Sequence, residues 1–110
     1  MKTADVIIVG SGASGLFNAL FLPQDYKVIV ITKKEVEESD SFLAQGGISA
    51  LKNPEDYDSY FEDTMKAGHY ENDKGAVEKM IKESPQIIQD LKDFGVRFDL
   101  KDGEIEFTRE

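Results

Sequence analysis

Three glycines near the start of the chain have the spacing of a phosphate-binding turn. Gly10, Gly12 and Gly15, within GSGASG, fit the pattern G-x-G-x-x-G. In this pattern the first glycine permits a tight turn, the second lets a phosphate approach the backbone, and the third lets a helix pack closely on a strand. The free amides near Gly12, Ala13 and Ser14 would then face an anion at a helix N-terminus. The alternative is a glycine-rich turn without a ligand.

The flanking residues predict the elements that position this turn. Residues 6–9 (VIIV) form an apolar strand before it, and a helix-like apolar run follows until Pro23. Residues 27–32 (KVIVIT) are typical of a second buried strand. Residues 4–32 therefore predict a right-handed β-α-β unit with parallel strands and the glycine turn at their carboxyl edge. Residues 33–47 have no clean periodicity, and we expect a loop beside that edge.

The end of the second predicted strand departs from the usual dinucleotide pattern. An acid that binds ribose is expected about 20 residues beyond the glycines. This chain has Thr32, Lys33 and Lys34 there, and Glu35 comes only after the strand should have ended. Lys33 could instead neutralise a phosphate or bind a cofactor edge; the alternative is a solvated lysine at a strand end.

A second glycine pair lies in SFLAQGGISAL, residues 41–51. Gln45, Gly46 and Gly47 offer hydrogen-bond donors in a chain that can approach a flat ligand closely. Such donors would stabilise the negative charge of a reduced flavin and so favour hydride acceptance. A bare turn explains the glycine pair equally well.

The rest of the chain predicts helices and a hairpin. A helix is expected over residues 58–67 with Gly68 as its stop, and Asp73 caps the next helix. Ser84 and Pro85 are an N-cap and first-turn pair that opens a further helix. The segment VRFDLKDGEIEF alternates around an Asp-Gly pair, which predicts a β-hairpin with a type I′ turn.

Composition narrows the function classes. The chain has 22 acidic and 13 basic residues, and its net charge of −9 argues against nucleic acid or an anionic membrane as a partner. No apolar run approaches the ~20 residues of a membrane span, and the start of the chain does not fit a signal peptide. The chain has no cysteine, which excludes disulfides and thiol catalysis within it. We therefore expect a cytoplasmic location.

The sequence predicts only two core-like strands, which are too few for a doubly wound sheet. We expect the front part of a larger α/β protein, with an apolar face left exposed where further strands would pair. A small self-sufficient α+β domain is the alternative. The expected divisions are residues 1–50 for the β-α-β unit and second glycine loop, 51–95 for a helical segment, and 96–110 for the hairpin.

Several stretches resemble the L-aspartate oxidase family of the succinate dehydrogenase/fumarate reductase flavoprotein group. They are GSGASG, VIVITK, SDSFLAQGGISAL, EDTMKAGHYENDKGAVEKM and LKDFGVRFD, and the resemblance covers essentially all 110 residues. It implies the N-terminal part of a Rossmann-like FAD-binding domain. It also implies oxidation of L-aspartate to iminoaspartate, with oxygen or fumarate reoxidising the FAD. The product would pass to quinolinate synthase, a candidate partner, in the biosynthesis of NAD.

The resemblance carries over to individual positions of this sequence. The pyrophosphate loop of the family falls on Ser11 to Ser14, and its strand-end lysine falls on Lys33. Asp40 matches the position of the histidine that binds FAD covalently in membrane succinate dehydrogenases, which implies non-covalent FAD here. The flavin-contacting loop of the family falls on Asp40, Ser41, Phe42, Leu43, Ala44, Gln45, Gly46 and Gly47.

The resemblance also bears on catalysis. The terminal T-R-E segment implies that Glu110 orients the amino group of L-aspartate. The catalytic arginine and carboxylate-binding histidines of the group lie beyond the first hundred residues, so we expect the chain alone to be inactive. A fumarate reductase or succinate dehydrogenase flavoprotein subunit, and a nucleotide-binding module without chemistry, remain alternatives.

Overall fold

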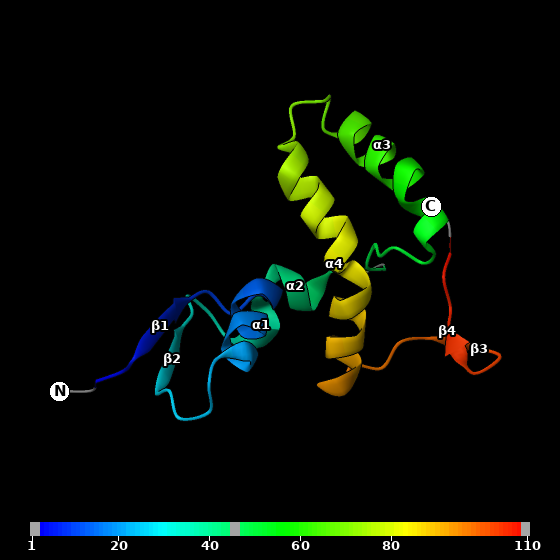
Figure 1. The fold of residues 1–110 in the computed structure, drawn as a ribbon. Coiled ribbons are helices and arrows are strands. Elements are labelled where there is room, and N and C mark those ends of the chain that lie inside the picture. Colours follow the sequence, from blue (N-terminus) through cyan, green and yellow to red (C-terminus); the bar gives the residue numbers. More distant parts are fainter. Residues whose placement is uncertain (1–2, 45–46, 109–110) are drawn as a thin grey trace. The chain divides into compact units, whose positions relative to one another are not determined.

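The computed structural model describes residues 3–44 and 47–108, which fall into two compact units. The first unit comprises residues 1–47 and the second comprises residues 48–110 (Figure 1). Each unit is described below by itself.

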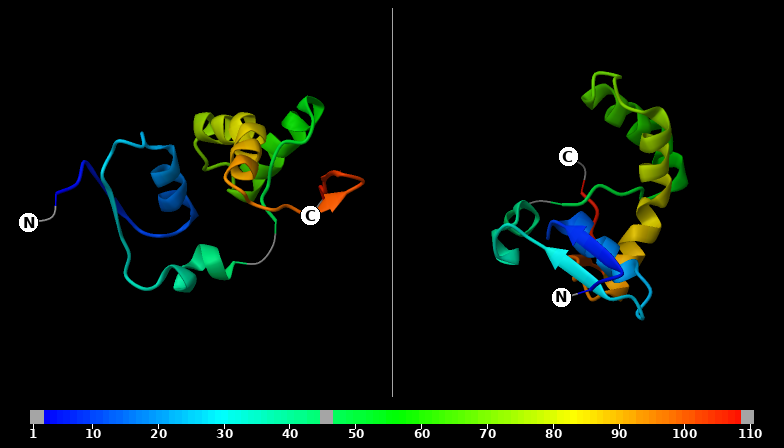
Figure 2. Two further views of the ribbon diagram at one scale, coloured as in Figure 1. Left: turned by 90° about the horizontal axis from the view of Figure 1, so that it is seen from below. Right: turned by 90° about the vertical axis from the view of Figure 1, so that its left-hand side faces the viewer.

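The first unit is a β-α-β arrangement. Strand β1 (Val6–Val9) is followed by helix α1 (Ala13–Phe21) and strand β2 (Val28–Ile31). The two strands are parallel, with Val6 opposite Val28 and Val9 opposite Ile31. They lie side by side with their arrows in the same direction in the right-hand view of Figure 2. The predicted order, pairing and direction are confirmed, and the chain has mixed α/β content.

The apolar residues of this unit are only partly covered. Helix α1 packs against both strands, but Ile7 and Val9 remain 59% and 83% exposed. Within the described part of residues 1–47, Ser11 is the only buried residue, at 5% exposure. The predicted exposed apolar face is therefore present, and the most buried side chain of the unit is polar.

Residues 33–47 are not simply a loop, so that prediction was wrong. A 3-10 helix, η1 (Val36–Glu38), and a short helix, α2 (Asp40–Leu43), interrupt the segment. Ser39 caps α2, because its Oγ accepts a hydrogen bond from the Phe42 amide at 3.3 Å. A helix of one turn contains too few residues to display a helical period. The serine cap was the local signal that could have identified it.

The second unit contains the hydrophobic core. A 3-10 helix, η2 (Pro54–Asp56), leads into α3 (Tyr57–Ala67), which ends at Gly68 as predicted, and α3 packs against α4 (Lys74–Asp93). Asp73 caps α4 by accepting a hydrogen bond from the Ala76 amide at 2.8 Å, which confirms its predicted role. The core consists of Met65, Val77 and Ile81, with Leu51, Tyr57, Tyr60 and Phe61 packed against it.

Helix α4 is continuous where the sequence predicted two helices, so Ser84 and Pro85 are not a helix start. Pro85 has no amide proton to donate to the carbonyl of Ile81, four residues earlier. Ser84 Oγ donates to that carbonyl oxygen at 2.7 Å and accepts a hydrogen bond from the Leu51 amide at 2.8 Å. The buried serine thus supplies the donor that the proline lacks, and the helix continues.

The predicted hairpin is confirmed as strands β3 (Leu100–Lys101) and β4 (Glu104–Ile105), which pair antiparallel. Asp102 and Gly103 have φ of 54° and 85°. Positive φ at both central positions is the signature of a type I′ turn.

Candidate cofactor-binding site

A cleft of about 410 Å³ lies at the carboxyl ends of β1 and β2. Three segments line it: the glycine turn at residues 10–12, the end of β2 at residues 32–35, and residues 38–41 at the start of α2. Ligands of open α/β sheets bind in this position relative to the strands. The cleft is therefore the candidate site of the first unit.

The glycine turn has the geometry that its spacing predicts. Gly10 has φ of +114°, and its amide donates to the carbonyl of Ile31 in β2 at 2.8 Å. A Cβ on Gly15 would lie 2.3 Å from the carbonyl oxygen of Gly10. Only glycine at residue 15 therefore lets the helix lie this close to the turn. The turn is thereby held against both the strand and the helix.

Backbone amides at the start of α1 are available for hydrogen bonds. The first hydrogen bond of this helix runs from the Leu16 amide to the Gly12 carbonyl, so the preceding amides have no acceptor within the helix. One of them, the Ala13 amide, donates to Ser41 Oγ at 2.9 Å. Amides at a helix start can bind an anion with the help of the helix dipole, and Ser41 is the side chain that the structure brings to this helix start.

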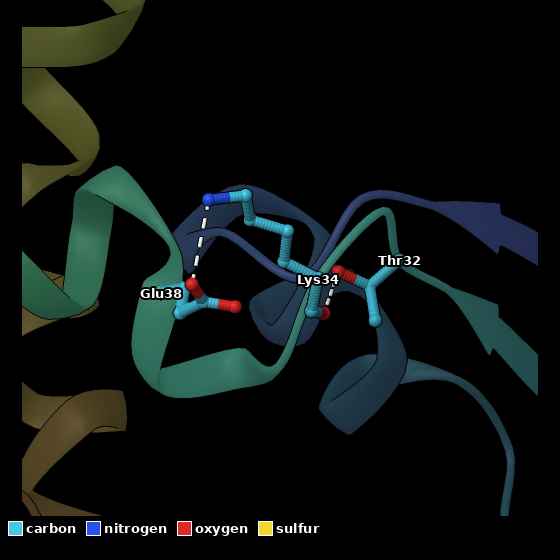
Figure 3. Close-up of polar contacts among 3 residues, drawn as sticks. All are labelled: Thr32, Lys34 and Glu38. Atoms are coloured by element: carbon cyan, nitrogen blue, oxygen red, sulfur yellow. Dashed lines mark hydrogen bonds and ion pairs between the residues drawn. The ribbon is translucent and has the colours of Figure 1, made fainter.

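Two hydroxyl groups connect the glycine turn to the end of β2. Ser11 Oγ lies 2.8 Å from Thr32 Oγ1, and Thr32 Oγ1 donates to the carbonyl oxygen of Lys34 at 2.9 Å. Figure 3 shows the hydroxyl of Thr32 directed at this carbonyl. The Thr32 hydroxyl therefore contacts both the glycine turn and the Lys34 carbonyl. Residue 32 itself carries no carboxylate.

The two lysines of the cleft differ in their partners. Lys34 Nζ forms an ion pair with Glu38 Oε1 at 3.3 Å, and its side chain reaches across to η1 in Figure 3. Both side chains of that pair are more than half exposed, so the pair contributes little to stability. Lys33 also lines the cleft, and within the described residues it forms no ion pair.

The structure brings together part of the predicted site. Ala13, Ser14 and Gly15 form the first turn of α1, while Phe42 and Leu43 are 62% and 64% exposed outside the cleft lining. Ala44 and Gly47 are also exposed and outside the lining. Gln45, Gly46 and Glu110 lie outside the described residues. The predicted residues that line the cleft are Gly10, Ser11, Gly12, Lys33, Asp40 and Ser41.

Sequence reasoning missed other residues of the lining. Thr32 and Lys34 were noted only as replacements for an absent acid, and Glu35 only as arriving late. Glu38 and Ser39 were not considered, because no regular element was expected there. For residues 32–35, the position directly after a strand at the carboxyl edge was the available signal. The residues in question are Thr32, Lys34, Glu35, Glu38 and Ser39.

Comparison with known proteins identifies the ligand class. The family described as "FAD binding domain" matches residues 5–110. The chain belongs to this family. FAD is therefore indicated as its cofactor. The cleft fits a nucleotide, because the turn has no side chain at residues 10 and 12, a helix begins beside it, and a lysine is in the lining.

Individual relatives are similar over nearly the whole chain. The chain is 43% identical over 109 residues to "L-aspartate oxidase" of Clostridium perfringens, covering 99% of this chain and 25% of the relative. It is 44% identical over 107 residues to the protein of that name from Clostridium acetobutylicum, covering 96% and 25%. For "L-aspartate oxidase" of Synechocystis the identity is 46% over 96 residues, covering 86% and 17%. The chain thus spans a quarter or less of these relatives.

No solved structure matches this chain. Among the described residues, no helix has the length and apolarity that crossing a bilayer requires.

Proposed function

We propose that this chain is the Rossmann-like nucleotide-binding part of an FAD-dependent L-aspartate oxidase. The observation that carries the proposal is the cleft at the carboxyl ends of β1 and β2, where the glycine turn and the start of α1 meet. The names of similar proteins from several bacteria supply the substrate. They do not favour a fumarate reductase, a succinate dehydrogenase subunit or a module without chemistry.

The cofactor is held non-covalently in this proposal. The glycine turn at the start of α1 and Lys33, which both line the cleft, bind the pyrophosphate, because backbone amides at a helix start and an ammonium group attract anions. Ser41 and the loop through Gly47 bind the flavin side, and Gln45 and Gly46 belong to that loop. Asp40 cannot form the covalent bond that a histidine forms with FAD. When bound, FAD would supply a hydride acceptor for the oxidation of the substrate, with oxygen or fumarate as the final electron acceptor.

Glu110 is assigned a role toward the substrate. The ammonium group distinguishes L-aspartate from succinate and fumarate, and a carboxylate is the natural partner of a cation in a partly desolvated site. The same carboxylate repels dicarboxylates that lack the ammonium. The resemblance to the L-aspartate oxidase family adds that the product would pass to an enzyme such as quinolinate synthase in the biosynthesis of NAD.

The test uses the full-length natural polypeptide that contains these residues. With oxygen excluded, L-aspartate should bleach the bound flavin, whereas succinate should not. Bleaching by succinate and not by L-aspartate would overturn the proposal in favour of the dehydrogenase group.

A substitution tests the role of Glu110. Glu110→Gln should impair aspartate oxidation far more than fumarate reduction, with unchanged flavin content, because only the first reaction involves the ammonium. Equal losses for both reactions would contradict this role.

A further inference from the structure

Thr32 lies where dinucleotide-binding folds usually place an acid. It directly follows β2, whose last residue is Ile31, and it lines the cleft together with Ser11. In such folds a carboxylate near this point accepts a hydrogen bond from the ribose of the nucleotide. Here the residue is a threonine, so the ribose requires another acceptor.

The hydrogen bonds fix the direction of both hydroxyl groups. The carbonyl oxygen of Lys34 can only accept, so the bond at 2.9 Å uses the single hydroxyl proton of Thr32. Thr32 must therefore accept in its contact with Ser11, and Ser11 donates across the 2.8 Å between the two oxygens. Both protons are committed within the protein.

The hydroxyl oxygens of Ser11 and Thr32 can therefore only accept further hydrogen bonds. A hydroxyl has two lone pairs, so Ser11 keeps two and Thr32 keeps one after the bond from Ser11. A carboxylate likewise offers only acceptors, and ribose hydroxyls are donors. The pair therefore has the hydrogen-bonding character of the missing acid without its charge.

We propose that the hydroxyl pair of Ser11 and Thr32 accepts hydrogen bonds from the ribose of the adenine nucleotide, in place of the strand-end carboxylate. The proposal rests on the nucleotide site proposed above and names the group that recognises its ribose. Ser11 is suited to the task because it is 5% exposed and its hydroxyl is held by Thr32.

The carboxylates of the cleft are the competing candidates. Glu38 is engaged by Lys34 at 3.3 Å. Glu35 and Asp40 also line the cleft, and both are exposed. Glu35 lies nearest to the strand end in sequence, so Glu35→Gln is the variant that tests a carboxylate as the ribose acceptor.

ADP is the probe, because it contains the ribose and pyrophosphate but no flavin. Its dissociation constant is measured calorimetrically with the FAD-free full-length polypeptide. Thr32→Val should weaken ADP binding about tenfold, the effect of losing roughly one hydrogen bond, and Thr32→Ser should bind like the natural protein. Thr64→Val is the matched control, since the hydroxyl of Thr64 also donates to a backbone carbonyl, that of Tyr60 at 2.8 Å, outside this unit.

The dideoxyribose analogue of ADP lacks the ribose hydroxyls. It therefore distinguishes recognition of the ribose by Thr32 from a purely structural role of Thr32 in the loop. If the pair binds the ribose, Thr32→Val should weaken binding of ADP but not of the analogue. Equal weakening for both would overturn the proposal and leave Thr32 a structural role. Unchanged ADP binding in Thr32→Val, or loss of the ribose preference in Glu35→Gln alone, would also overturn it. If the natural polypeptide bound neither ADP nor FAD, the proposed nucleotide site would itself fail.

Discussion

Gly15 lies so close to Gly10 that a Cβ at residue 15 would stand 2.3 Å from the carbonyl oxygen of Gly10. This carbonyl is backbone and cannot move aside without opening the turn. Gly15→Ala should therefore destabilise the protein by about 1–3 kcal/mol, as overpacking does, and reduce FAD content. Thermal or urea unfolding of the full-length polypeptide measures the first effect, and flavin absorbance measures the second.

Gly75→Ala is the control for this substitution. A Cβ on Gly75 would meet only Asp73 Oδ1, at 3.3 Å, and this atom belongs to a side chain at the start of α4. Its effect on stability should stay within about 1 kcal/mol. If Gly15→Ala were as well tolerated as this control, the close packing of turn and helix would not be required.

Gly12→Val should remove FAD without unfolding the protein. A Cβ on Gly12 would meet only Ser41 Oγ, at 3.2 Å, so the fold can accept a side chain there. The same side chain would occupy the cleft in which the pyrophosphate is proposed to lie. Flavin absorbance should be lost while circular dichroism and the melting temperature change little. Normal flavin content in this variant would place the phosphate elsewhere.

Acid precipitation should release all of the FAD. Asp40 lines the cleft at the start of α2, and the resemblance matches it to the linking histidine of the covalent flavoproteins. A carboxylate does not form that bond, so the supernatant should contain the flavin and the pellet should be colourless. Flavin retained in the pellet would contradict non-covalent binding.

Ser84→Ala should destabilise the protein by about 1–3 kcal/mol, because it leaves the Ile81 carbonyl and the Leu51 amide without their partner. The cost should be smaller in a Pro85→Ala background, where residue 85 regains an amide proton that can reach the same carbonyl. Ser59→Ala, at an exposed serine, serves as a control and should stay within about 0.5 kcal/mol. Equal costs of Ser84→Ala in both backgrounds would refute the compensation. Denaturant unfolding measures all of these variants.

The turn between α3 and α4 should respond to high pH. Tyr70 donates to Glu62 Oε1 at 2.6 Å, and this hydrogen bond, aided by desolvation and the negative charge of Glu62, raises the pKa of Tyr70 above 10.0. Because the pKa is raised in the folded state, the bond stabilises the fold below pH 10 and is lost as the pH rises through the folded value. Glu62→Gln should lower this pKa in an ultraviolet titration of phenolate, with Tyr70→Phe identifying the signal. No difference between Glu62→Gln and the natural protein would contradict this role of Glu62.

Local patterns were sufficient for much of the fold. The apolar run at residues 6–9 followed by Gly10 predicted a strand and its turn, and Asp102 with Gly103 predicted the hairpin, because conformational preference acts within a few residues. Asp73 was identified as a helix cap for the same reason. Such features need no distant partner.

The sequence pattern was misleading where hydrogen bonds of a buried side chain decide the secondary structure. Ser84 and Pro85 have the form of a helix start, but burial of Ser84 against Ile81 and Leu51 makes a continuous helix stable. The helix propensity of neighbouring residues cannot predict this hydrogen bond, because the Leu51 amide lies 33 residues away from Ser84 in the chain.

For the site, the sequence by itself determined the glycine turn and the absence of an acid at the end of β2. Both are properties of residue type, since only glycine accepts φ of +114° readily and a threonine carries no charge. Only the tertiary structure decided which side chain meets Thr32 at this strand end. Parallel pairing of β1 and β2 brings Ser11 within 2.8 Å of Thr32, which lies 21 residues away in the chain, and the Lys34 carbonyl then sets the direction of both hydroxyls.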